Sequence, residues 1–269
     1  MALWRRQVFV QVGSPSETGK SFAGLRVSFD VKMSRASSPN SATLEIYNVN
    51  PASVALAQDS AAEVRLLVGY DVPRLIFVGN PVKNGVRLDR RGPDRVLHIE
   101  AQDGGRSYAD SRVSVSFTTQ TTARQVFDAV AAQMGLPQGT IRVDETLVFP
   151  KGIVLAGPAR DVLDRLADSL GSDWFIRDGA LQFVGTGEDT GEAAVVFSAA
   201  TGNLIGSPSP KDGGIQVRAL LEPGIRPGKV FKVESEDYTG FYTAGDVQFQ
   251  GDSGWDTPYY VVVQGKPRS

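Results

Sequence analysis

The sequence of 269 residues contains no cysteine and a single histidine, His98. The absence of cysteine excludes a disulfide framework, a thiolate nucleophile and a cysteine-ligated zinc site. One histidine cannot build a histidine-based metal site. These absences remove common routes to nucleophilic and metal-assisted catalysis, and no serine lies in a nucleophile-elbow motif. We therefore predict no catalytic, metal-binding or cofactor-binding residues, and no cofactor.

Long apolar runs are missing as well. No run approaches the roughly 20 apolar residues that a membrane helix needs. The N-terminal sequence MALWRRQVFVQV has two arginines but only a short apolar stretch, which is unlike a signal peptide. The net charge of −2 implies no general surface for polyanions. We expect a protein that is made and folded in the cytoplasm, without a membrane anchor.

The segment GSPSETGKS, which begins at Gly13, nearly matches a phosphate-binding P-loop. That motif has four residues between its first glycine and the Gly-Lys pair, whereas five residues, Ser14 to Thr18, lie here. The motif also needs a helix after the loop, but the following LRVSFDVKM alternates apolar and polar residues as a strand does. We predict that GSPSETGKSFAG connects two strands, with Lys20 in solvent and no bound nucleotide.

Glycine and proline are frequent, with 29 and 15 residues, and many short β-branched runs lie between them, which indicates a strand-rich fold. We predict a mainly β protein with an α+β part. Two β-barrel or sandwich domains, residues 1–111 and 186–269, would flank a small α+β domain, residues 112–185. In the first domain, Asn50 and Pro51 predict the start of a short helix. The charged segment RLDRRGPDR predicts a solvated loop.

Two central segments repeat one pattern. ARQVFDAVAAQMG and ARDVLDRLADSLG align with an offset of 36 residues, and each has apolar residues at helical spacing. Thr122 and Gln125 predict a capping box for the first helix, Pro158 predicts the start of the second, and Gly135 and Gly171 predict left-handed ends. We interpret the pair as a duplicated strand-helix unit.

The second helix is followed by WFIRDGALQFV. Asp178-Gly179 lies between two alternating runs there, which predicts a hairpin with a two-residue turn. The next segment, GTGEDTGE, is polar and rich in glycine, which predicts a linker. Strands return beyond it.

The remaining titratable residues form no recognisable acid–base pair. The best acidic cluster is GDSGWD, with Asp252 and Asp256, but calcium loops need more oxygen ligands at regular spacing. Asp128 and Asp164 occupy matching positions of the repeat, which favours a shared role on the helix surface. His98 alternates with its apolar neighbours, which predicts a half-exposed strand histidine.

The last third of the chain resembles the hub proteins of bacteriophage tails and baseplates, of the type found beneath the tube in contractile tails. The resemblance rests on GIQV, LLEPGIRPG, GFYT and GDSGWDT in that order, although Thr243 departs from the usual aliphatic residue. The segments FDVKMS and NSATLEIYNVNP and both central helices are similar to the family too. The residues that carry the motif are Gly214, Ile215, Val217, Leu220, Leu221, Pro223, Gly228, Gly251, Asp252 and Trp255.

This resemblance implies a structural protein of the virion, located in the tail baseplate. Three copies, each with two tail-tube-like β domains, would form a pseudo-sixfold ring that joins the sixfold tube to the threefold spike. Its partners would be further copies of the chain, the tail tube or tube-initiator protein, the spike or tail-tip protein, the tape measure and other baseplate proteins. DNA would pass through the lumen. The alternative is a tail-associated protein that binds or hydrolyses peptidoglycan, a polymer that the central domain could also bind in a hub.

Overall fold

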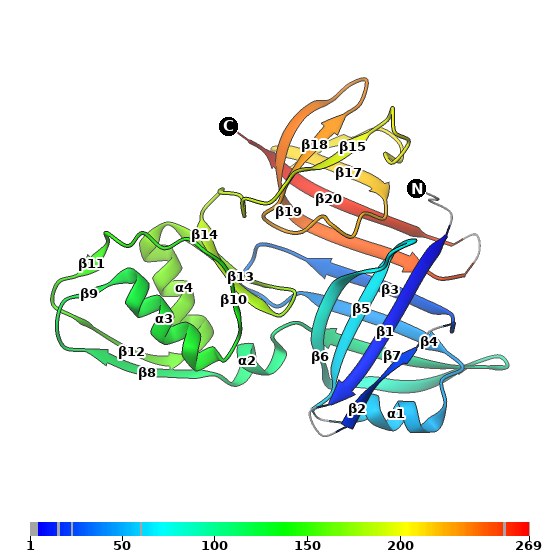
Figure 1. The fold of residues 1–269 in the computed structure, drawn as a ribbon, viewed down its shortest axis with the longest axis horizontal. Helices are drawn as coiled ribbons and strands as arrows, with labels where there is room; N and C mark the ends of the chain where they lie inside the picture. Colours follow the sequence, from blue (N-terminus) through cyan, green and yellow to red (C-terminus); the bar gives the residue numbers. More distant parts are fainter. Residues whose placement is uncertain (1–4, 15–16, 23, 60, 255–256, 269) are drawn as a thin grey trace.

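The computed structural model describes residues 5–14, 17–22, 24–59, 61–254 and 257–268. The fold is mainly β with a smaller α+β part, as predicted. In Figure 1 strands 1–7 and 15–20 form one body, in which β1 and β5 cross in front of β3, β4 and β7, and the central segment projects from its side. No helix among the described residues combines the length and apolar character needed to cross a membrane.

The N-terminal part is built from alternating strands. It contains β1 (Arg6–Ser14), β2 (Glu17–Phe22), β3 (Val27–Met33), β4 (Ser41–Tyr47), α1 (Pro51–Gln58), β5 (Glu63–Tyr70), β6 (Arg74–Arg91) and β7 (Asp94–Gln102). In β3, Val27, Phe29, Val31 and Met33 are buried while the residues between them are not, which is the period-two pattern of a half-buried strand. The predicted cap of α1 is confirmed, because the Asn50 side chain accepts a hydrogen bond from the backbone of Ser53.

The central part contains both repeated helices. Its elements are α2 (Gly105–Asp110), β8 (Arg112–Phe117), β9 (Thr121–Thr122), α3 (Ala123–Met134), β10 (Gln138–Ile141), β11 (Val148–Phe149), β12 (Ile153–Pro158), α4 (Ala159–Leu170), β13 (Ser172–Arg177) and β14 (Ala180–Gly185). The capping box of Thr122 and Gln125 is present. Gly135 and Gly171 adopt the left-handed conformation. Pro158 is the N-cap of α4, one position earlier than the first helical residue.

The C-terminal part is all β. It contains β15 (Val195–Ser198), β16 (Ser209–Lys211), β17 (Gly214–Leu220), β18 (Val230–Glu234), β19 (Thr239–Asp252) and β20 (Tyr259–Pro267). It joins the N-terminal part through an antiparallel ladder between β19 and β3, in which Phe249 lies opposite Val31. The described residues thus form a 13-stranded sheet in the order β16-β17-β20-β19-β3-β4-β7-β6-β5-β1-β2, with β18 beside β19 and β15 beside β18.

The described residues form two hydrophobic clusters. The first includes residues of both terminal parts, from Val8 to Ala101 and from Phe197 to Val263. The second includes only residues between Val113 and Phe183, around α3 and α4. The central part therefore has a core of its own, and the two terminal parts share one. The domain boundaries after residues 111 and 185 stay a prediction.

Three local predictions were wrong. The segment predicted to connect two strands contains β2, which pairs with β1 and places Lys20 opposite Val12. Phe22 is buried at the end of β2, and this buried side chain favours a strand over a free loop. The predicted absence of a helix after Gly19-Lys20-Ser21 is confirmed, and Lys20 is exposed. The segment RLDRRGPDR is solvent-exposed, as predicted, but it is a hairpin of β6 and β7 instead of a loop, because its residues pair across a turn. The third wrong prediction is the half exposure of His98, which is buried.

Candidate functional site

One face of the sheet is polar over several adjacent strands. The outward residues of β3, β4, β7 and β19 lie in register across it, so that Asp252, Ser28, Glu45 and His98 form one row. The next row contains Gln250, Asp30, Thr43 and Glu100. We call the following set the polar sheet face: Ser28, Asp30, Lys32, Ser41, Thr43, Glu45, His98, Glu100, Gln248, Gln250 and Asp252.

Hydrogen bonds fix the side chains on this face. The amide groups of Gln248 and Gln250 both donate to the Asp30 carboxylate, at 2.9 to 3.0 Å. The Tyr260 hydroxyl donates to Gln250, and the Arg218 guanidinium lies 3.8 Å above the Tyr260 ring. The surface is shallowly hollowed between β3, β4 and β19. It is therefore an ordered wall of amides, hydroxyls and paired charges.

His98 occupies this face but is buried, with 7% of its surface exposed, so the prediction of a half-exposed histidine was wrong. Neighbouring long side chains cover it: Glu100 Oε1 accepts a hydrogen bond from its Nε2 at 3.0 Å, and Glu45 lies 3.8 Å from Nδ1. Arg91 in turn binds Glu45. The hydrogen bond from His98 and a second one from Arg87 hold the pKa of Glu100 below its usual value. His98 therefore belongs to a charged row of the wall.

The predicted motif residues separate into three places. Gly214, Ile215, Val217 and Leu220 lie on β17, and the two middle side chains are in the first core. Gly251 and Asp252 end β19, where Asp252 accepts hydrogen bonds from Arg26 at 2.9 to 3.2 Å. Trp255 lies outside the described residues. The rest, Leu221, Pro223 and Gly228, lie in the loop between β17 and β18.

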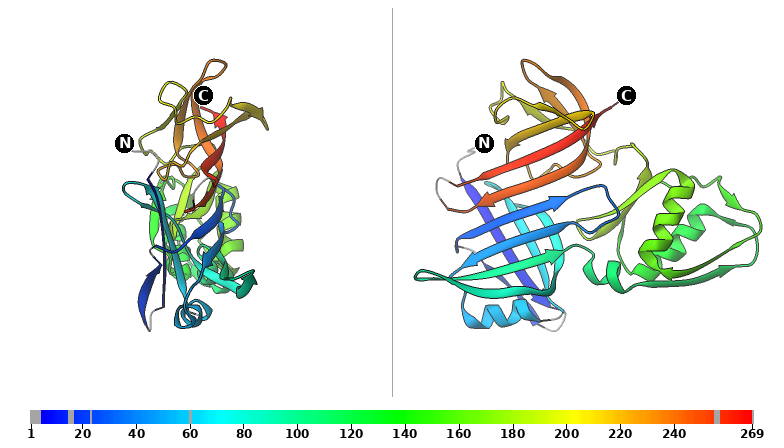
Figure 2. Two further views of the ribbon diagram at one scale, coloured as in Figure 1. Left: turned by 90° about the vertical axis from the view of Figure 1, so that its right-hand side faces the viewer. Right: turned by 180° about the vertical axis from the view of Figure 1, so that it is seen from behind.

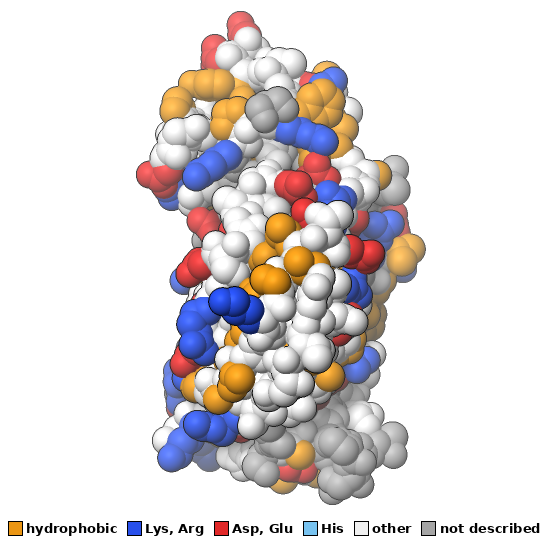
Figure 3. All heavy atoms as spheres, turned by 90° about the vertical axis from the view of Figure 1, so that its left-hand side faces the viewer, with side chains coloured by type: hydrophobic (Ala, Val, Ile, Leu, Met, Phe, Trp, Pro, Cys, Tyr) orange, Lys and Arg blue, Asp and Glu red, His pale blue; other side chains and the backbone are white. Residues whose placement is uncertain are grey.

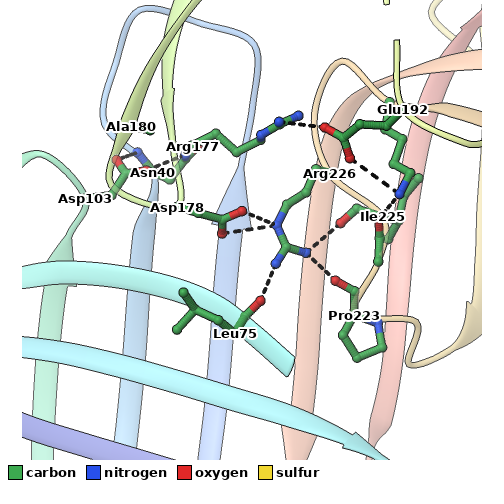
Figure 4. Close-up of polar contacts among 12 residues, drawn as sticks. Asn40, Leu75, Asp103, Arg177, Asp178, Ala180, Glu192, Pro223, Ile225 and Arg226 are labelled. Atoms are coloured by element: carbon green, nitrogen blue, oxygen red, sulfur yellow. Dashed lines mark hydrogen bonds and ion pairs between the residues drawn. The ribbon is translucent and has the colours of Figure 1, made fainter. Parts of the chain in front are cut away.

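That loop forms a polar junction with the central part, shown in Figure 4. Arg226 is 6% exposed. Its Nε donates to both Asp178 carboxylate oxygens at 3.0 and 3.1 Å, Nη1 donates to the carbonyls of Pro223 and Ile225 at 2.5 and 2.8 Å, and Nη2 donates to the carbonyl of Leu75. A single side chain thus binds the loop, the start of β6 and the β13–β14 turn.

The turn that Arg226 holds is the predicted hairpin. Asp178 and Gly179 both have positive φ, 52° and 78°, between Arg177 and Ala180 of the paired strands. This geometry confirms the two-residue turn and aims the Asp178 carboxylate at the guanidinium. A buried cation is stable only when it is paired and hydrogen-bonded, and here both conditions are met.

A second junction contact involves Asn40 and Asp103, both buried. The Asn40 amide donates to Asp103 Oδ2 at 2.6 Å and to the carbonyl of Ile176 in β13 at 2.7 Å. Burial raises the pKa of Asp103 to about 7, although the hydrogen bonds from Asn40 act in the opposite direction. Asp103 directly precedes Gly104 and α2, where the chain leaves the sheet for the central part.

The segment predicted as a polar linker is also fixed in place. Glu192 pairs with Arg177 at 2.6 Å and Lys229 at 3.5 Å. Burial alone would raise the pKa of Glu192, but the two cations together lower it. Thr190 donates its backbone N–H to the carbonyl of Gly228 at 2.9 Å, and a Cβ on Gly228 would lie 2.9 Å from the Thr190 methyl group. Gly228 therefore permits close contact with the segment.

Sequence reasoning missed the junction. Arg226 and Asp178 are 48 residues apart and Asn40 and Asp103 are 63 apart, so no local pattern connects them. The available signal was an arginine enclosed by rigid turn residues in PGIRPGK. The matching helix carboxylates of the repeat have local roles: Asp128 pairs with Arg124, and Asp164 accepts a hydrogen bond from the Trp174 indole. Among the described residues, no three His, Asp or Glu side chains are grouped to hold a metal ion.

The central part presents a further surface at its far end. Figure 3 views the molecule from that side, where hydrophobic side chains gather among polar ones. Leu147, Val148 and Val154 of the central part are exposed, Val154 by 73%. These residues come from the loop before β11, from β11 and from β12. β11 forms a two-stranded ribbon with β9, and β12 forms another with β8. This apolar surface is outside the two predicted β domains.

No protein-family model matches the sequence, and no curated protein matches it. Solved structures do match along almost the whole chain. The 43 kDa tail protein of prophage MuSo2 from Shewanella oneidensis has a TM-score of 0.68 at 10% identity, over 97% of this chain and 98% of that one. A tail protein from Neisseria meningitidis MC58 has a TM-score of 0.68 at 11% identity, over 97% and 96%.

A third similar structure is the Escherichia coli c3393 protein, described as a component of the type VI secretion system with structural similarity to the T4 tail proteins gp27 and gp5. Its TM-score is 0.64 at 11% identity, over 96% of this chain and 77% of that one. The similarity includes all three parts of the chain, at identities that establish the fold alone. The resemblance expected from the sequence motifs is confirmed at this level: the chain has the fold of phage tail proteins.

Proposed function

We propose that this chain is a structural hub protein of a phage tail baseplate, of the contractile-tail type. Three copies form a pseudo-sixfold ring that joins the sixfold tail tube to the threefold spike. The observation that carries this proposal is the similarity to tail proteins over 97% of the chain, together with the single sheet that unites the two terminal parts. A chain with two β parts can occupy two positions of a sixfold arrangement.

The polar sheet face is our candidate for the channel wall. Its acidic groups are held by neighbours, as Asp30 is by Gln248 and Gln250, and Lys32 is the one lysine or arginine in this set. Tight DNA binding requires lysines and arginines that neutralise phosphates. A wall of amides and paired charges offers few such contacts, so DNA would pass without being trapped. The motif residues would then serve to build and orient this wall.

The proposed partners follow from the same ring. They are further copies of the chain, the tube or tube-initiator protein, the spike or tail-tip protein, the tape measure and other baseplate proteins. One similar protein is described as structurally similar to the T4 tail proteins gp27 and gp5, and another similar structure is a PdpA–VgrG complex. Both support a location next to a spike. The proposed site of action is the virion, after assembly in the host cytoplasm.

The polar junction suits a structural role. It binds the central part through Arg226, Asn40 and Glu192, which use their hydrogen-bonding groups on protein partners. A reacting group must instead have free access to a substrate. We therefore propose that the chain is not an enzyme. Peptidoglycan binding or hydrolysis is the alternative, because the exposed apolar surface of the central part is not explained by the ring.

Two experiments test these proposals. The mass of the purified chain, measured by light scattering with and without tube and spike proteins, should correspond to a trimer in at least one mixture. Electron microscopy of tails that carry a tagged chain should place the tag between tube and spike. A monomer in every mixture, or a tag elsewhere in the particle, would contradict the hub. Clearing of purified peptidoglycan in a zymogram would contradict the non-enzymatic proposal and support the alternative.

A further inference from the structure

The β6–β7 hairpin carries two arginines directly opposite each other. Arg90 lies in register with Arg95, and like charges in that position destabilise a hairpin. The neighbouring arginines have acidic partners: Arg87 pairs with Asp89 and Glu100, and Arg91 pairs with Glu45. Within the described part of the chain, neither Arg90 nor Arg95 forms an ion pair.

An exposed apolar side chain lies beside this pair. Leu88 is two residues before Arg90 on β6 and therefore faces the same side of the hairpin. It is opposite Leu97, which is fully buried, yet Leu88 itself is 43% exposed. The hairpin thus extends beyond the core and presents a leucine and two arginines together. We call Leu88, Arg90 and Arg95 the basic hairpin face.

The turn between β18 and β19 has the opposite charge. Glu236 and Asp237 are adjacent and exposed at its tip, and we call these two residues the acidic turn. Glu234, just before it, already pairs with Lys232 at 2.7 Å. No ion pair within the described ranges involves Glu236 or Asp237. The turn is well ordered, because Ser235 Oγ donates to the carbonyl of Tyr238 at 2.9 Å and accepts from the Tyr238 amide at 3.1 Å.

The two charged elements lie far apart on one molecule. In Figure 1 the β18–β19 turn is at the top and the β6–β7 hairpin, in teal, is at the lower right; Figure 2 shows the same separation in two further views. One chain cannot bring them together, whereas two copies arranged head to tail can. A repeated head-to-tail contact that closes gives a ring.

We propose that the basic hairpin face of one copy binds the acidic turn of the next copy and closes the ring. This inference rests on the proposed trimer and names the contact within it. The partner is a second copy rather than nucleic acid, because the chain itself supplies an ordered acidic element, far from the hairpin, that forms no ion pair within the described residues. The contact relieves the repulsion between Arg90 and Arg95 and covers Leu88.

Charge reversal tests the contact in solution. Arg90→Glu with Arg95→Glu, and separately Glu236→Lys with Asp237→Arg, should each lower the trimer fraction at least tenfold at about 0.15 M salt, where surface charges act only over about 8 Å. Combining all four changes should restore the trimer. The control for the arginine pair is Arg112→Glu with Lys151→Glu, because these exposed central residues give the same total change in charge as Arg90→Glu with Arg95→Glu. This control should leave the mass unchanged.

Cross-linking tests it in assembled tails. Because the chain has no cysteine, Arg95→Cys with Glu236→Cys introduces the only thiols, and oxidation should give a ladder that ends at the trimer. Lys151→Cys with Glu236→Cys is the control pair and should not cross-link. A trimeric wild type whose mass resists both reversals and whose cysteine pair fails to cross-link would overturn the contact and leave the hub intact.

The other outcomes are equally distinct. A wild type that stays monomeric with its partners and gives no ladder in tails overturns both the contact and the ring. Binding of a DNA oligonucleotide that is lost in the Arg90→Glu, Arg95→Glu variant, with an unchanged trimer fraction, assigns the basic hairpin face to nucleic acid and also overturns the contact.

Discussion

Replacing Arg226 by methionine tests the junction most directly. The guanidinium side chain is 8% exposed and binds Asp178, which is 32% exposed. Methionine fills a similar volume and removes every hydrogen bond to Asp178 and to the carbonyls of Leu75, Pro223 and Ile225. The substitution therefore leaves one carboxylate and three carbonyl groups without their donor.

The expected cost follows from the burial of the pair. Breaking a buried ion pair by removing one partner typically costs about 3 to 5 kcal/mol. Asp178 retains access to water on one side, and the carbonyls can also regain water if the loop moves outward. Both effects limit the loss, so we expect the free energy of unfolding to fall by about 3 kcal/mol. Arg226→Lys should lose about half as much, because lysine keeps the charge but lacks the planar fork.

Urea denaturation followed by tryptophan fluorescence gives the free energy of unfolding, and amide hydrogen exchange shows which segments are destabilised. Exchange should increase at the β13–β14 turn and in residues 186–192, and stay unchanged in β3 and β19, which lie in the shared core. Asp178→Asn is the matched control, since asparagine tolerates the left-handed turn conformation and removes only the charge. A loss below about 1 kcal/mol with unchanged exchange would refute the reasoning that this arginine holds the junction together.

Three further predictions concern other positions. Asp103 has a pKa raised to about 7 in the folded chain, so the folded state binds more protons than the unfolded state between about pH 4 and 7. The free energy of unfolding should therefore fall as the pH rises through this window, by up to about 4 kcal/mol. Asp103→Asn should flatten this dependence on pH, as measured by denaturation at several pH values. Gly251→Ala would place a Cβ 2.3 Å from the Phe29 ring, and this overpacking should cost about 1 to 3 kcal/mol and lower the melting temperature. Gly245→Ala is the control, because its Cβ would have its nearest contact at 3.8 Å and should change the melting temperature little. Equal shifts for the two variants would contradict the steric argument. Thr122→Ala removes one half of the capping box and should lower the free energy of unfolding by about 1 kcal/mol. Amide hydrogen exchange should become faster in the first turn of α3 and stay unchanged in α4.

Elements with local signals could be predicted from the sequence. The start of α1 needs only Asn50 and Pro51, and the Asp178-Gly179 turn needs only two adjacent residues, because each is determined by hydrogen bonds within a few positions. The mainly β fold with a central α+β part followed in the same way from periodicity and turn residues. The short β2 was missed because its sequence, ETGKSF, does not alternate apolar and polar residues, although Phe22 at its end is buried.

The arrangement of these elements could not be predicted, because long-range contacts determine it. The ladder between β3 and β19 joins residues more than 200 positions apart, such as Val31 and Phe249, and nothing in either strand specifies its partner. The burial of His98 has the same cause, since Glu45 comes from β4 and Arg91 from the far side of a hairpin. The motif residues were identified by resemblance alone, and the structure distributes them over a strand, a strand end and a loop.

The ends of the sheet explain why copies of the chain would meet through side chains. Within the chain, the two β parts join by a full backbone ladder between β3 and β19. At the outer end of the sheet, β16 is only three residues long and contains Pro210 and Lys211, and short edges with proline and lysine oppose the addition of another strand. The proposed ring of three copies would then have two kinds of joint: a ladder inside each copy and a contact of charged side chains between copies. The unpaired arginines and the acidic turn are suited to the second kind, and such a joint can form after each copy has folded.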